Sequence, residues 1–149
     1  MVKRTLIILL LLSIVLECNN LWTMDRIELP EKFSKTALYS FILSLGIKYP
    51  KIVYAQARIE SGNFHSKLFR ESFNMFGMTY SGKHKSVSVG LKNGYNVYNS
   101  WKASVIDYKL WQDRMIHKID NEESYLFYLQ EHYAENGEEY IILIKKMKK

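Results

Sequence analysis

The feature that most constrains the fold is a succession of helix-length amphipathic segments with a stop signal at each end. Between 31 and 48 the apolar residues recur at spacings of three, four and seven, and Gly46 lies where that helix should end. Pro50 suits the first turn of a second helix, which is expected to end at Gly62. A short helical turn is expected over 66–71. These signals predict a mainly helical chain.

The same kind of punctuation divides the C-terminal third of the chain. Ser100 is placed to cap a helix that starts at Trp101. Asp120 and Glu123 have the spacing of a capping box for the next helix. A last helix is expected after Gly137, with acidic residues at its start and lysines at its end, as the helix dipole favours.

One stretch, 78–98, breaks the helical pattern. Val87 and Val89 alternate with serines, as in a strand with one buried face. Asn93-Gly94 suits a tight type I′ turn, and an aromatic strand from Tyr95 to Tyr98 follows it. We therefore expect a mainly α (α+β) domain, over 30–149, that carries a small β-hairpin flap.

The first twenty residues have the layout of an export signal. Lys3 and Arg4 precede an apolar run over 6–16, which is about half the length needed to cross a bilayer. A cleaved signal peptide is the main interpretation of 1–20, and an uncleaved N-terminal anchor is the alternative. Cys18 occupies the place of a lipidated cysteine, although Glu17 stands where a small residue is usual. The sequence predicts an exported protein of the periplasm or cell envelope, whose contact with the membrane is limited to this segment.

Composition narrows the classes of partner. The 149 residues leave room for one core, and a net charge of +6 favours anionic partners such as nucleic acid, anionic lipid or an acidic cell wall. Cys18 is the only cysteine, which excludes an intramolecular disulfide and a multi-cysteine zinc site. The four histidines lack metal-ligand spacing, so no metal and no other cofactor is expected.

Glu60 is the strongest candidate for chemistry. It lies in the last turn of a predicted helix, where the negative end of the helix dipole raises the pKa of its carboxyl group. An apolar cleft beside it would raise that pKa further. A carboxylic acid that stays protonated near neutral pH can donate a proton to the leaving oxygen of a glycosidic bond. An ordinary solvated glutamate at a helix end is the alternative that residue type and position leave open.

Three ordered sequence blocks bear on that choice. They run from Ala55 to Gly62 (AQARIESG), over 74–78 (NMFGM), and over 94–108, where an aromatic strand leads into a helix containing Ser-Val-x-Asp. Together they resemble the glucosaminidase domain of glycoside hydrolase family 73, whose members hydrolyse peptidoglycan. The resemblance extends over about 35–147. It implies a lysozyme-like fold, Glu60 as general acid, and peptidoglycan glycan strands as substrate, cut at the β-1,4 bond after N-acetylglucosamine.

The resemblance also implies four substrate-binding residues. Tyr95 matches a tyrosine near the scissile sugar, and Asn74 either binds sugar or holds its own turn. Phe76 and Tyr98 are candidates for stacking on sugar rings, with core packing as the alternative for both. We expect the protein to act as a monomer.

The second catalytic group is missing from its usual place. Many relatives carry a carboxylate in the flap, whereas 80–98 contains no acidic residue. Glu71 or Asp107 could take that role, or the substrate's own 2-acetamido group could attack the anomeric carbon, a known exception to the two-carboxylate scheme. We favour the acetamido group. The absent carboxylate also supports an alternative function, a catalytically inactive protein that binds the wall. Nucleic acid is not an expected partner, because the lysines and aromatic residues follow no known binding module.

Overall fold

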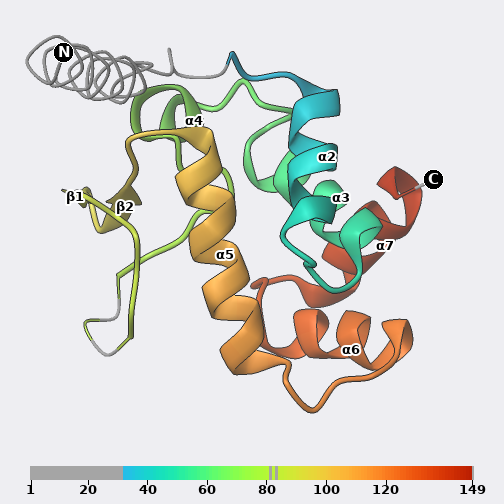
Figure 1. The fold of residues 1–149 in the computed structure, drawn as a ribbon. Helices are drawn as coiled ribbons and strands as arrows, with labels where there is room; N and C mark the ends of the chain where they lie inside the picture. The colour runs from blue at the N-terminus through green and yellow to red at the C-terminus, as the bar shows by residue number, and fades with distance from the viewer. Residues whose placement is uncertain (1–31, 81, 83, 149) are drawn as a thin grey trace, which may run out of the picture. The chain divides into compact units, whose positions relative to one another are not determined.

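The computed structural model describes residues 32–80, 82 and 84–148 (Figure 1). The described residues from Phe33 onward form one compact unit, and the predicted export segment lies outside the described residues. The elements, in chain order, are α2 (Lys35–Ser44), α3 (Pro50–Glu60), α4 (Lys67–Ser72), β1 (Gly90–Lys92), β2 (Tyr95–Val97), α5 (Trp101–Met115), α6 (Glu122–His132) and α7 (Gly137–Met147). The expected mainly α domain with a small hairpin is confirmed. Within the described part of the chain, no helix is long and apolar enough to span a bilayer.

Side-chain caps set the starts of the helices. Ser34 accepts a hydrogen bond from the backbone N–H of Ala37, so α2 begins four residues later than the start expected at 31. Ser100 caps α5 as predicted. The capping box predicted for α6 is wrong in its first residue: Asn121, and not Asp120, accepts from the backbone of the first turn. Aspartate and asparagine both cap helices well, so the sequence alone does not show which of these two neighbours is the N-cap.

The β interruption is a short antiparallel hairpin. Gly90 pairs with Val97 and Lys92 with Tyr95. Asn93 and Gly94 both have positive φ, at 53° and 82°, as the predicted type I′ turn requires. The strands are shorter than the sequence pattern suggested.

The sequence pattern predicted Val87 in a strand, and this prediction is wrong. It lies outside both strands because its backbone N–H donates to the side chain of Asp107 on α5, at 3.0 Å. A single bridge between Thr79 and Tyr95 joins the hairpin to the loop after α4.

A buried polar network fixes α3 against α5 and α6. The Tyr108 hydroxyl donates to Oε1 of Gln56 at 2.6 Å and lies 2.7 Å from the Tyr125 hydroxyl. Gln112 donates to the Lys48 carbonyl at 3.0 Å and accepts from the Lys48 N–H at 2.9 Å. Buried side-chain networks of this kind lose much of their stabilisation if one partner is removed. The network therefore holds the start and middle of α3 in a fixed position relative to α5, and with them the helix end that carries Glu60.

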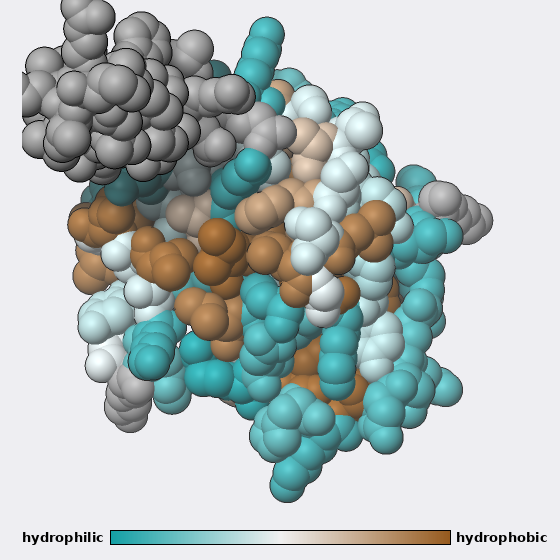
Figure 2. All heavy atoms as spheres, in the orientation of Figure 1, coloured by the Kyte–Doolittle hydropathy of each residue, from teal (hydrophilic) through white to brown (hydrophobic). Residues whose placement is uncertain are grey.

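Apolar surface remains on the face that carries the hairpin. Figure 2 shows brown, apolar residues gathered across this face, and mostly hydrophilic residues over the α6 end. Val89 and Leu91 of the hairpin region are 56% and 55% exposed. A two-stranded hairpin is only marginally stable by itself, so its contacts with the loop after α4 and with α5 hold it in position.

Candidate active site

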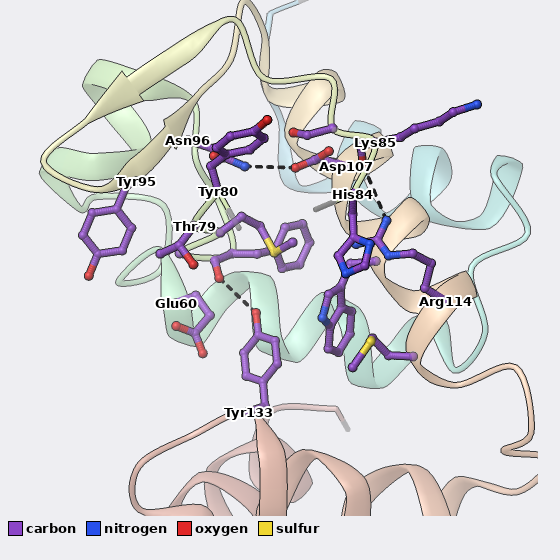
Figure 3. Close-up of a pocket in the computed structure, with 16 residues that line it drawn as sticks. Glu60, Thr79, Tyr80, His84, Lys85, Tyr95, Asn96, Asp107, Arg114 and Tyr133 are labelled. Carbon is purple, nitrogen blue, oxygen red and sulfur yellow. Dashed lines mark hydrogen bonds between the residues drawn. The ribbon is translucent and has the colours of Figure 1, made fainter. Parts of the chain in front are cut away.

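One cavity of about 460 Å³ lies between the end of α3, the loop after α4, the hairpin and α5 (Figure 3). That volume suits a small-molecule or oligosaccharide site. Its walls are made by Glu60, Phe76, Gly77, Met78, Thr79, Tyr80, His84, Lys85, Ser86, Tyr95, Asn96, Asp107, Trp111, Arg114, Met115 and Tyr133.

Glu60 is the last residue of α3 and lines the cavity. Burial raises the pKa of its carboxyl group above 4.5, and a hydrogen bond with the Tyr140 hydroxyl lowers it by a smaller amount. The negative end of the α3 dipole acts in the same direction as burial. Gly77 lies close by: a Cβ built there would be 3.7 Å from Oε2 of Glu60. The raised pKa expected for Glu60 is thus found, and its main cause is desolvation.

A tight turn carries the chain away from Glu60 and back across the cavity. The Ser61 hydroxyl donates to the Ala57 carbonyl and accepts from the Phe64 N–H at 2.9 Å. Gly62 has φ +55°, as predicted for a glycine that ends a helix. Asn63 and Phe64 also have positive φ, at 53° and 72°, which is uncommon for such residues. The turn is therefore a strained feature next to the candidate acid.

Asn74 holds two cavity walls together from behind. Its Nδ2 donates to the backbone carbonyls of Met78 and Asn96, at 2.8 and 2.9 Å, and its Oδ1 accepts from the Met78 N–H at 2.9 Å. The side chain is 1% exposed and does not line the cavity. Every strong hydrogen-bonding site of this amide except one lone pair is thus used within the protein.

Asp107 is fixed by three donors. Its Oδ2 accepts from the Tyr98 hydroxyl at 2.7 Å and from Nδ2 of Asn96 at 3.2 Å, and its Oδ1 accepts from the Val87 N–H at 3.0 Å. Tyr98 is 2% exposed, and burial together with the Asp107 hydrogen bond raises the pKa of its phenol. Asp107 therefore ties α5 to the hairpin and to the segment before it.

The aromatic residues divide into buried and accessible groups. Phe76 is 2% exposed and stacks on Tyr108 with ring centroids 4.2 Å apart. The Tyr133 hydroxyl donates to the Phe76 carbonyl at 2.9 Å, which brings the loop before α7 into the cavity wall. Tyr95 is 40% exposed, and Figure 3 shows it on the Glu60 side of the cavity. Of the predicted site residues, Glu60, Phe76 and Tyr95 line the cavity, whereas Asn74 and Tyr98 lie behind it.

Comparison with known proteins decides the family. A family model described as glucosaminidase, mannosyl-glycoprotein endo-beta-N-acetylglucosaminidase, matches residues 43–149. The chain belongs to the glucosaminidase family. The resemblance drawn from the three sequence blocks is confirmed, and the glucosaminidase domain is a glycosidase domain. No curated protein matches the chain.

A solved structure shares the fold of this glucosaminidase domain. It is the catalytic domain of the autolysin Auto from Listeria monocytogenes, with a TM-score of 0.55 and 21% sequence identity. The match covers 89% of this chain and 92% of that one. The lysozyme-like α+β fold is thereby confirmed.

Sequence reasoning missed many residues of the glucosaminidase cavity, Arg114 and His84 among them. Asp107, Trp111 and Arg114 line it from one face of α5, at helical spacings of four and three, and Met115 adjoins them at the end of the helix. The apolar spacing of this helix predicts Trp111 and Met115 on one face together, whereas no sequence motif marks Arg114. His84 lacks metal-ligand spacing, as the other histidines do, and nothing else in the sequence marks it. In the described chain, no three His, Cys, Asp or Glu side chains lie close enough to hold a metal ion.

Proposed function

We propose that the protein is an exported peptidoglycan hydrolase that cleaves the β-1,4 bond after N-acetylglucosamine, with Glu60 as general acid. The observation that carries this proposal is a carboxyl group with a raised pKa on the wall of a cavity in a glucosaminidase domain. The fold shared with an autolysin catalytic domain supports peptidoglycan as the substrate class.

The first step requires a proton at the leaving oxygen. Glu60 in its protonated form donates that proton as the bond from the anomeric carbon to the leaving oxygen breaks. Burial favours the protonated form before the reaction. The Tyr140 hydroxyl then stabilises the carboxylate that remains.

The substrate's 2-acetamido group serves as the nucleophile. Its carbonyl oxygen bonds to the anomeric carbon from the face opposite the leaving group and gives a cyclic oxazolinium intermediate. Water then attacks the same carbon, the Glu60 carboxylate takes the proton from that water, and the acetamido group is released. Two displacements at one carbon give net retention of the β configuration.

The state of the other carboxylates supports this route. Asp107, the second carboxylate on the cavity wall, already accepts three hydrogen bonds from the protein. Glu71 is exposed and lines a different cavity. It also pairs with Lys92, which lowers the pKa of its carboxyl group. Neither group is free to act as a second catalytic carboxylate without breaking existing contacts.

Tyr95 orients the acetamido group in this proposal. Its side chain is exposed on the Glu60 side of the cavity (Figure 3). Phe76 is 2% exposed, so it offers the sugar little surface. Asn74 and Tyr98 support binding indirectly, through the walls that they hold.

The remaining parts of the proposal concern the protein as a whole. Residues 1–20 act as the export signal or as an anchor, and 30–149 are the catalytic domain, which works as a monomer. Export to the cell envelope brings the domain to its substrate.

Analysis of the products tests this function. Sacculi incubated with the purified protein should release muropeptides whose new reducing end is N-acetylglucosamine, identified by mass spectrometry after borohydride reduction. A new reducing end on N-acetylmuramic acid contradicts the assigned bond. Tight binding to sacculi without release of any reducing end favours the inactive wall-binding protein, which the lack of a flap carboxylate supports.

A further inference from the structure

The end of the cavity opposite Glu60 is formed by Arg114 and His84 (Figure 3). Arg114 lies in the last turn of α5, on the helix face that carries Trp111 and Met115 into the same wall. Lys85 lines this end too, but Figure 3 shows its amine pointing away from the cavity. Among the described residues, the positive charge that faces the cavity at this end is therefore the Arg114 guanidinium.

Arg114 has few partners in the part of the chain that the structure describes. Among the described residues it makes one hydrogen bond, from a terminal nitrogen to the Lys85 carbonyl at 3.5 Å, which is longer than the usual range of about 2.7–3.2 Å. Its Nε is buried and has no hydrogen-bond partner. A guanidinium carries five N–H donors in a planar fork, so the described residues leave most of the donor capacity of Arg114 unused.

The nearby acidic residues are occupied elsewhere. Asp107 accepts from three other groups, and Asp113, next to Arg114 in sequence, pairs with Lys109. Among the described residues, no carboxylate lies within the 4.0 Å of an ion pair with Arg114. An arginine fork matches the geometry of a carboxylate through two parallel hydrogen bonds. The apolar surfaces of Trp111 and Met115 beside it strengthen such a pair by excluding water.

We propose that Arg114 forms a carboxylate-binding subsite that recognises the acidic substituent of the sugar next to the scissile N-acetylglucosamine. The inference rests on the proposed function and specifies its substrate. Peptidoglycan alternates N-acetylglucosamine with a sugar bearing a lactyl group, so each side of the scissile unit carries such a substituent. The carboxylate comes either from a free lactyl group or from the stem peptide attached to it. His84 contributes a further donor beside the guanidinium.

Four soluble glycan preparations test the subsite. One keeps its stem peptides, one has them removed by an amidase so that the lactyl carboxylate is free, and each is also prepared with its carboxylates blocked as methylamides. The measured quantity is the ratio of kcat/KM on a native strand to kcat/KM on its blocked form. We expect Arg114→Gln to lower this ratio by about tenfold or more, the usual effect of losing a charge-assisted hydrogen bond. The strand on which the ratio changes identifies the source of the carboxylate.

Two further variants separate charge from structure. Arg114→Lys keeps the positive charge and should recover part of the ratio. Arg70→Gln removes an exposed arginine that does not line the cavity, and should leave the ratio at the wild-type value. A ratio that is unchanged in Arg114→Gln, or rates that fall equally on native and blocked strands, overturns the subsite and leaves Arg114 with a structural role.

A binding measurement keeps the subsite testable if the proposed function fails. Glu60→Gln, with and without Arg114→Gln, is titrated with native and blocked strands. Preference for native strands that depends on Arg114 supports the subsite even if the wild-type protein hydrolyses nothing. Equal affinity for native and blocked strands contradicts it, whatever the hydrolysis assay shows.

Discussion

Replacing Asn74 with alanine separates the two roles that the sequence left open for this residue. The substitution removes hydrogen bonds of 2.8, 2.9 and 2.9 Å that join the Met78 and Asn96 backbones behind the cavity. Each buried hydrogen bond contributes about 1 kcal/mol to stability, and its loss costs more where the partner stays unsatisfied. We therefore expect Asn74→Ala to lower the free energy of unfolding by roughly 3 kcal/mol. That is a large part of the 5–15 kcal/mol typical of a domain.

Urea denaturation followed by far-ultraviolet circular dichroism measures this loss, and a drop in Tm on the order of 10 °C should accompany it. Asn99→Ala is the matched control, because Asn99 is exposed; its unfolding free energy should stay within about 0.5 kcal/mol of wild type. A folded Asn74→Ala variant of nearly wild-type stability whose activity is lost would refute the reasoning. That result would place the Asn74 side chain on the sugar.

Three other substitutions probe the cavity. Glu60→Gln should be more stable than wild type at neutral pH but not below about pH 4.5. The reason is that folding raises the pKa of the Glu60 carboxyl group, so the stability of the wild type falls as pH rises from 4.5 through the folded-state pKa. Denaturation curves of both proteins across this pH range measure the difference. Gly77→Ala, at φ +65°, should lower the free energy of unfolding by about 1–2 kcal/mol. It should also move the basic limb of the pH–rate profile to higher pH, because the new methyl group lies against Glu60. Gly46→Ala, at φ +61° with open space around it, is the control and should lower stability equally without moving that limb. Tyr95→Phe should lower kcat/KM about tenfold with little change in Tm, because the side chain is exposed, and a large fall in Tm would instead assign Tyr95 to packing.

Local signals in the sequence were sufficient for most of the helices. Ser100 and the Asn93-Gly94 turn act through their own backbone neighbourhood, so their positions could be predicted without knowledge of the tertiary fold. The same holds for Glu60, because its place at a helix end is a local property. Val87 shows the limit: its alternating pattern predicted a strand, but its N–H bonds to Asp107, a residue far along the chain.

The cavity could be predicted only in part. The resemblance pointed to Glu60, Phe76 and Tyr95, and all three line it. Asn74 belongs to the same sequence block, and only the folded structure shows that its amide faces the backbone of two separate segments. Arg114 could not be predicted, because tertiary packing decides which face of α5 lines the cavity, and the hydrophobic pattern of the helix does not show that face.

The rate at which the purified protein and its Glu60→Gln variant release N-acetylglucosamine reducing ends from sacculi tests the central claim most directly. The substitution keeps the shape of the side chain and removes the transferable proton. The account predicts a loss of roughly 100- to 10 000-fold, the usual contribution of a general acid, with the variant still folded and still bound to sacculi. A Glu60→Gln variant that releases these ends at the wild-type rate would contradict it.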